Sequence, residues 1–186
     1  LALLSRVPVV SATTFQYRDF VVTNRYQRRF SRDFLYVRVR PRSLPDVHIF
    51  VVHAPSRLGG REFTDVLRTA EARAGVAILN ELFQRDTNAL IAVLGDFNDE
   101  PEDASIRIYT SNRKVPLRRM PAVDSRGRRH TWISTGSSYP SATFDNILLS
   151  LPAASLVKKA GRIWNEAGAA EASDHRLVSV DLIMPR

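Results

Sequence analysis

The stretch ALIAVLGDFNDEP, residues 89–101, decides the fold. Its first six residues are all apolar, which is typical of a strand that is buried on both faces of a sheet. Asp96 and Asn98 follow this run directly. Polar side chains at the end of a rigid strand can be directed into a cleft, although Asp-Phe-Asn also suits an ordinary turn. We predict a buried strand that ends in functional residues, with a turn or short helix after Pro101.

Further strands are predicted on both sides of this stretch. Apolar or alternating runs predict them over residues 1–10, 34–40, 47–53, 144–150 and 177–183. We expect the first of these, LALLSRVPVV, to be a buried strand. The order of the predicted elements indicates an α/β (α+β) chain with a mixed or antiparallel sheet. The Gly-rich signatures of Rossmann and P-loop folds are absent from the sequence.

One long helix is predicted over residues 62–86, after the pair Gly59-Gly60. Its apolar residues recur with a period of 3.6 and would form one stripe facing the core. The stripe consists of Phe63, Val66, Leu67, Ala70, Ala74, Ala77, Ile78 and Leu82.

Composition excludes several classes of protein. The 186 residues are enough for one domain. The sequence has no cysteine, so disulfides, thiolate catalysis and Cys-ligated metal sites are excluded. No apolar run approaches the roughly 18 residues that would span a membrane.

The charge is basic and unevenly distributed. The formal net charge is +8, and 24 of the 27 basic residues are arginine. Residues 18–42 have a net charge of +6, and residues 107–129 a net charge of +7. Two such stretches favour a polyanionic partner, while two solvated surface loops, with arginine favoured by a GC-rich genome, are the alternative.

Polar residues end or begin several of the predicted strands. They are His53, Asp96, Asn98, Asp145, Asp174 and His175. Each alone is compatible with a structural role. Together they could hold a hard divalent ion, activate a water and protonate a leaving oxygen, and phosphodiester cleavage needs these three tasks.

These motifs resemble the endonuclease/exonuclease/phosphatase superfamily, which includes deoxyribonuclease I, exonuclease III-type enzymes, inositol polyphosphate 5-phosphatases and bacterial sphingomyelinases. The resemblance rests on HAPSRLGG after a strand that ends at His53, on GDFNDEP (95–101) and on SDH (173–175). The Thr131-Trp132 pair and FDNILLS (144–150) also match. The resemblance implies a deoxyribonuclease I-like two-sheet β-sandwich flanked by helices, and Mg²⁺, or alternatively Mn²⁺ or Ca²⁺, as cofactor.

The resemblance also implies roles for single residues. His53 would serve the leaving or scissile phosphate oxygens, and Asp96 would orient or deprotonate the water. Asn98 would contact phosphate and help to fix Asp96. Asp145 would support the imidazole of His175, which would contact the scissile phosphate.

Metal and substrate contacts follow from the same resemblance. It places Asp96, Asn98 and Asp174 beside the metal. Phe30-Ser31-Arg32 resembles a deoxyribonuclease I segment whose arginine touches DNA phosphate, so Arg32 is a predicted substrate contact. Arg57 is a second one.

One part of the family pattern does not occur in this sequence. The family has an early strand ending in Asn and then a Gln-Glu motif whose Glu is the principal metal ligand. Residues 1–10 resemble the strand that follows these, so the chain resembles the C-terminal two-thirds of the family. We expect residues 1–186 to form a single domain that lacks its N-terminal strands because it is a fragment. A naturally short relative that binds metal weakly is the alternative.

The leading hypothesis is therefore a metal-dependent phosphoester hydrolase, most simply a nuclease. A phosphatase, a lipid phosphodiesterase of the same superfamily, and a catalytically impaired polyanion-binding module are the alternatives. We expect a nucleic-acid substrate, no membrane span and a monomer. The sequence identifies no protein partner and no compartment.

Overall fold

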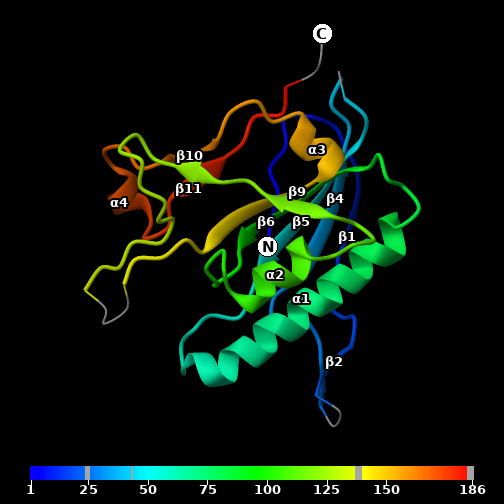
Figure 1. Ribbon diagram of the computed structural model, residues 1–186, viewed down its shortest axis with the longest axis horizontal. Helices are drawn as coiled ribbons and strands as arrows, with labels where there is room; N and C mark the ends of the chain where they lie inside the picture. The colour runs from blue at the N-terminus through cyan, green and yellow to red at the C-terminus, as the bar shows by residue number, and fades with distance from the viewer. Residues whose placement is uncertain (24–25, 43, 137–139, 184–186) are drawn as a thin grey trace.

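The computed structural model describes residues 1–23, 26–42, 44–136 and 140–183 (Figure 1). Its main element is a six-stranded sheet in the order β1-β4-β5-β6-β9-β7. In chain order these strands are β1 (Val9–Thr13), β4 (Phe34–Val39), β5 (Val47–His53), β6 (Leu90–Asp96), β7 (Leu117–Arg119) and β9 (Asp145–Ser150). β5 and β6 are parallel, and the other neighbours are antiparallel. The predicted mixed sheet is confirmed.

The remaining elements surround this sheet. A second sheet contains β8 (Ala122–Val123), β10 (Gly161–Trp164) and β11 (Leu177–Ser179), and β2 (Phe20–Thr23) pairs with β3 (Tyr26–Arg28). The helices of the described residues are α1 (Arg61–Phe83), α2 (Ala104–Thr110), α3 (Leu151–Ser155) and α4 (Ala169–Ala172). The expected α/β architecture of sheets flanked by helices is confirmed. Within these ranges, no helix has the length and apolar character needed to cross a membrane.

Side chains alternate across the six-stranded sheet and build a core on each face. On one face, Phe34, Phe50 and Val93 lie in a buried cluster to which α1 and α2 contribute. On the other face, Val37 and Leu149 belong to a second cluster, which includes residues of α3 and of the chain after β11. The sheet is therefore covered on both faces, as the apolar run of β6 predicts.

The register of the sheet brings three predicted site residues to one place. His53, the last residue of β5, pairs with Asp96, the last residue of β6. Asp96 in turn pairs with Asp145, the first residue of β9. Side chains directly opposite each other share one face of a sheet, so these three lie in a row across neighbouring strands.

The predicted apolar stripe of α1 is partly wrong. Phe63 is 76% exposed, Val66 45% and Leu82 43%, and Ala77 is also exposed. The side that faces the sheet includes two charged residues, Arg68 and Glu71. A pattern based on apolar residues alone misses such a face, because buried charges can be satisfied by hydrogen bonds.

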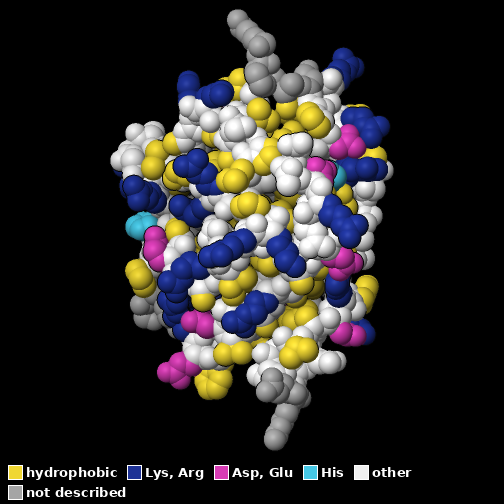
Figure 2. All heavy atoms as spheres, turned by 45° about the vertical axis from the view of Figure 1, so that its right-hand side comes forward, with side chains coloured by type: hydrophobic (Ala, Val, Ile, Leu, Met, Phe, Trp, Pro, Cys, Tyr) yellow, Lys and Arg dark blue, Asp and Glu magenta, His cyan; other side chains and the backbone are white. Residues whose placement is uncertain are grey.

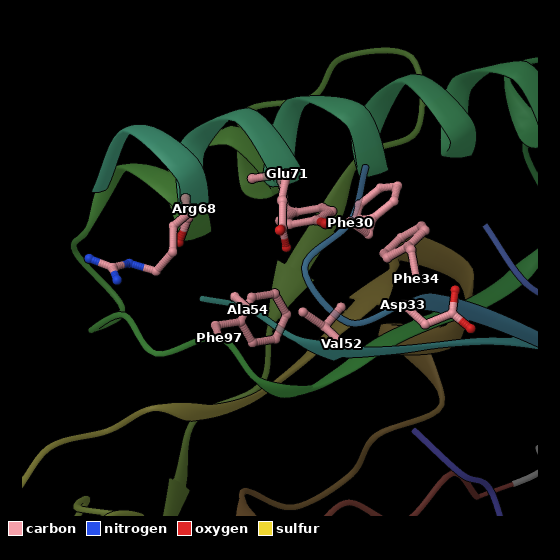
Figure 3. Close-up of a pocket in the computed structure, with 11 residues that line it drawn as sticks. Phe30, Asp33, Phe34, Val52, Ala54, Arg68, Glu71 and Phe97 are labelled. Carbon is pink, nitrogen blue, oxygen red and sulfur yellow. The ribbon is translucent and has the colours of Figure 1, made fainter. Parts of the chain in front are cut away.

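Arg68 and Glu71 of α1 line a small cavity (Figure 3) and bond to the loops beside it. Arg68 Nη1 donates to the carbonyl of Pro55 at 3.0 Å, and Glu71 Oε1 accepts from the backbone N–H of Ser31 at 2.8 Å. The cavity between them measures about 10 Å³. This is room for one water at most, so the cavity is not a substrate site.

Two predicted strands are shorter in the structure. β1 begins only at Val9, and Leu4 is fully exposed, because no described strand pairs with residues 1–8. The buried strand expected over residues 1–10 is therefore wrong for most of its length. β11 ends at Ser179, where it pairs with Arg162 near the start of β10. Beyond that point, Leu182 makes only an isolated bridge to Val157.

Candidate functional site

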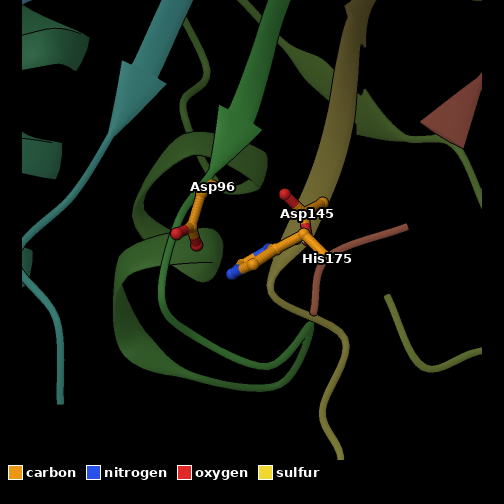
Figure 4. Close-up of side chains that lie close together, drawn as sticks. All are labelled: Asp96, Asp145 and His175. Atoms are coloured by element: carbon orange, nitrogen blue, oxygen red, sulfur yellow. The ribbon is translucent and has the colours of Figure 1, made fainter. Parts of the chain in front are cut away.

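Asp96, Asp145 and His175 converge where β6 ends and β9 begins (Figure 4). One potential ligand atom from each lies within 4.8 Å of the others. Asp96 ends β6, Asp145 begins β9, and His175 stands two residues before β11. Each residue is only partly buried. Residues far apart in the sequence thus form one accessible group of two carboxylates and an imidazole.

His175 and Asp145 form a hydrogen-bonded pair. The distance from His175 Nδ1 to Asp145 Oδ2 is 2.8 Å. Since a carboxylate oxygen can only accept, Nδ1 carries the proton. The other ring nitrogen points toward Asp96 in Figure 4. The hydrogen bond that Nδ1 donates to Asp145 raises the pKa of His175 above its ordinary value, so the ring is suited to donate a proton from Nε2.

Asp96 is held by the turn that follows it. The backbone N–H of Asn98 donates to Oδ1 at 2.8 Å, and Asn98 Nδ2 donates to Oδ2 at 3.1 Å. Asn98 has a φ of 50°, a left-handed conformation that asparagine tolerates better than most residues. Burial raises the pKa of Asp96 to about 6. The Gly-Asp-Phe-Asn motif therefore fixes the direction of one carboxylate.

Gly95 is required for the close approach of β6 to β5. Its φ is 135°, and a Cβ atom there would lie 2.0 Å from the carbonyl oxygen of Val52. That distance is far inside van der Waals contact, and the φ is one that side chains rarely adopt. The glycine of the motif is thus explained by backbone packing beside Asp96.

His53 lies next to Asp96. Its Nε2 is 3.4 Å from Asp96 Oδ2, and its side chain is 39% exposed. Burial lowers the pKa of His53, and the charges of Arg32 and His175 lower it further. The surroundings therefore favour the neutral form of His53 and the protonated form of His175.

Asp174 lies outside the group formed by Asp96, Asp145 and His175. Its Oδ2 accepts a hydrogen bond from Trp132 Nε1 at 2.9 Å. Thr131 precedes Trp132 in the chain. Its Oγ1 accepts a hydrogen bond from the backbone N–H of Asp145 at 2.9 Å. The sequence shows Thr131-Trp132 only as a pair that matches the family pattern, and it suggests no role for either residue. The structure shows that the pair joins the start of β9 to the segment that carries His175.

The two predicted substrate-binding arginines have different surroundings. Arg32 Nη1 donates to the carbonyl of Ala54 at 3.1 Å, and its charge lowers the pKa of both His53 and Asp96. Arg57 forms ion pairs with Asp99 and Asp103. Arg32 thus places positive charge beside the site, whereas the charge of Arg57 is balanced by two carboxylates.

Basic side chains are prominent on one face of the molecule (Figure 2). Figure 2 shows Lys and Arg side chains across one face, with Asp and Glu mainly toward its edges. Some of these arginines are paired, in Arg18–Glu81, Arg29–Asp19, Arg40–Asp46 and Arg128–Asp124. Exposed pairs of this kind add little stability, and the formal net charge of the chain is +8.

Comparison with known proteins gives a family match. A model described as "Endonuclease/Exonuclease/phosphatase family" matches residues 1–115. No curated protein matches the chain in sequence.

Solved structures share the fold. An endonuclease/exonuclease/phosphatase family protein from Leptotrichia buccalis has a TM-score of 0.63 at 16% identity, over 97% of this chain and 63% of that one. Truncated TDP2 from Caenorhabditis elegans has a TM-score of 0.63 at 17% identity, over 92% and 65%. A mutant beta toxin from Staphylococcus aureus with bound magnesium ions has a TM-score of 0.53 at 13% identity, over 80% and 53%. The chain thus spans less than two thirds of the length of these similar structures.

Proposed function

Because this chain belongs to the endonuclease/exonuclease/phosphatase family, we propose that it is a divalent-metal-dependent phosphoester hydrolase that cleaves phosphodiester bonds, with a nuclease as the leading candidate. One observation carries the proposal: Asp96, Asp145 and His175 present ligand atoms within 4.8 Å of one another. A partly exposed group of this composition can bind a cation and transfer protons at the same place.

The two carboxylates fit a divalent cation. Burial is the main cause of the raised pKa of Asp96, and the charge of Asp145 raises it further, so a cation between them would relieve an unfavourable arrangement. We propose Asp96 and Asp145 as holders of Mg²⁺, with Asn98 orienting Asp96. Metal contacts by Asn98 and Asp174 remain predictions. A bound divalent ion neutralises charge on a phosphate and lowers the pKa of water.

The protein side chains divide the proton transfers. Asp96 accepts the proton of the attacking water, because its carboxylate is fixed by two hydrogen bonds from Asn98. His175 donates its Nε2 proton to the oxygen of the leaving group as the phosphorus–oxygen bond breaks, because Asp145 occupies its Nδ1. His53, beside Asp96, serves the scissile phosphate oxygens as a neutral imidazole. In-line attack on phosphorus needs these donors and acceptors on two sides of one phosphate.

A nucleic acid is the proposed substrate. Arg32 places positive charge beside His53 and Asp96, where the phosphate must lie, and the basic surface would attract the rest of a polyanion. A lipid phosphodiesterase is the second candidate. Leu58 is 79% exposed and Phe63 76%, and both lie close in sequence to the loop after His53, where they could enter a lipid surface.

A substrate panel tests the proposal. Supercoiled plasmid, vesicles of a choline phospholipid and a phosphomonoester are incubated with the protein in Mg²⁺, with and without a chelator. We expect relaxation of the plasmid that the chelator abolishes. Phospholipid cleavage alone would select the second candidate. Salt-dependent DNA binding without cleavage of any substrate would contradict the proposal and support a binding module.

The pH dependence should report Asp96 and His175. The rate rises as Asp96 ionises, at a pKa that bound Mg²⁺ lowers from the metal-free value of about 6, and falls again as His175 loses its proton at a pKa above its ordinary value. Asp145→Asn removes the main cause of that raised pKa, so the descending limb should move to lower pH. Loss of such an orienting carboxylate typically lowers activity about 10- to 100-fold. An unchanged descending limb in the variant, measured as kcat against pH, would exclude His175 as the titrating acid.

A further inference from the structure

Three flat side chains connect the two halves of the site. Arg57 lies with its guanidinium carbon 4.8 Å from the centroid of the Phe144 ring. The rings of Phe144 and Trp132 are stacked, with centroids 5.6 Å apart and an interplanar angle of 25°. We call Arg57, Phe144 and Trp132 the stacked row. Phe144 is buried and immediately precedes Asp145.

Arg57, at one end of the stacked row, holds the turn that follows Asp96. Arg57 Nε donates to the carbonyl oxygen of Asn98 at 2.8 Å. Asn98 fixes both oxygens of Asp96. The guanidinium is itself held by Asp99 and Asp103, and only 18% of the Arg57 side chain is exposed. This guanidinium is a fixed part of the fold, which is unusual for a side chain whose task is to bind a substrate phosphate.

The other end of the row holds the His175 segment. Trp132 Nε1 donates to Asp174, the residue before His175. Trp132 also forms an isolated bridge with His175. Phe144, at the centre, accepts through its carbonyl from the backbone N–H of Phe97 at 2.9 Å. The row therefore contacts all the segments that carry Asp96, Asp145 and His175.

We propose that Arg57, Phe144 and Trp132 are positioning residues that set the separation between Asp96 and His175. The proposal rests on the proposed hydrolase function of this site. The sequence predicts that Arg57 contacts the substrate. In this proposal Arg57 acts instead through its hydrogen bond to Asn98. Because rates depend steeply on the placement of reacting groups, loosening the row should slow turnover without weakening substrate binding.

Phe144→Leu and Arg57→Lys test the proposal. Leucine keeps an apolar side chain but removes the ring, and lysine keeps the charge but cannot reproduce the fork that reaches Asn98, Asp99 and Asp103. We expect kcat to fall about 10-fold or more in each variant, with KM changed less than about 2-fold. Phe144→Tyr, which keeps the ring, should restore kcat. Arg61→Lys is the matched control, since Arg61 pairs with Asp103 and is outside the row, and its kcat should stay at the wild-type value.

Amide hydrogen exchange provides a readout that needs no activity. The Asn98 N–H is protected by Asp96 Oδ1, so its exchange should accelerate at least about 10-fold in both variants while amides within β6 keep their protection. If the wild-type chain hydrolyses none of the substrates, the proposed hydrolase function is wrong. The hydrogen exchange of the Asn98 amide still tests whether the row positions the Asp96 turn. Unchanged Asn98 exchange, a uniform loss of protection, or a raised KM with normal kcat in Arg57→Lys would overturn the proposal.

Discussion

His175→Ala is expected to lower kcat about 1,000-fold, because a positioned general acid contributes on the order of 10²- to 10⁴-fold to a rate. The imidazole, whose Nε2 faces Asp96, is the proposed proton donor, and alanine leaves neither a donor nor a partner for Asp145. The side chain of His175 is 32% exposed, so its truncation should leave the fold intact. Initial rates at saturating substrate, with circular dichroism as a check on folding, measure the effect.

His130→Ala is the control for this variant. His130 is an exposed histidine one residue before Thr131, and its loss should leave kcat unchanged within about 2-fold. Near-normal turnover in His175→Ala, or an equal loss in His130→Ala, would remove His175 from the mechanism.

Asp96→Asn should strongly lower turnover and stabilise the protein at the same time. Asparagine cannot accept the proton of the water and binds a cation weakly, so kcat should fall about 1,000-fold. The stability effect follows from the pKa of Asp96, which burial raises from 3.8 to about 6. A carboxyl group with a raised folded-state pKa gives the fold stability that is complete below its unfolded pKa and is lost as pH rises through the folded value.

The stability difference should therefore depend on pH. At about pH 3 the wild-type carboxyl is protonated in both states, and the two proteins should have similar Tm values. Between about pH 4 and pH 6 the wild type loses stability that the amide keeps. At neutral pH the variant should be more stable by about 1–3 kcal/mol, since one pKa unit corresponds to about 1.4 kcal/mol and one hydrogen bond from Asn98 must rearrange. Mg²⁺ should raise the Tm of the wild type only. A lower Tm of the variant at neutral pH would contradict the account of Asp96.

The sequence predicted the strands of the site well, because they are defined by local patterns. The apolar run before Gly95 and the alternation in residues 34–40 needed no knowledge of neighbours. Their register did need it. Asp96 pairs with both His53 and Asp145, a relation between distant segments that no local pattern contains. The resemblance to a family supplied that link for His53, Asp96, Asn98, Asp145 and His175. It also predicted Asp174 beside the metal, whereas Asp174 lies outside the group of Asp96, Asp145 and His175.

Three features could not be predicted because they depend on contacts across the fold. The buried side of α1 includes Arg68 and Glu71, which an apolar pattern assigns to solvent. Phe144 is an ordinary core residue in the sequence, and only the structure places it between Arg57 and Trp132. The strand expected over residues 1–10 had the right composition, but no described strand pairs with most of it.

Titration of the isotope-labelled chain with Mn²⁺ tests the central claim most directly, because this ion broadens the amide resonances nearest to it. The account predicts saturable broadening centred on Asp96, Asp145 and His175, reversed by Mg²⁺ and absent in Asp96→Asn. Broadening centred elsewhere, with these three residues unaffected at saturating ion, would contradict the claim that they form the metal site of a phosphoester hydrolase.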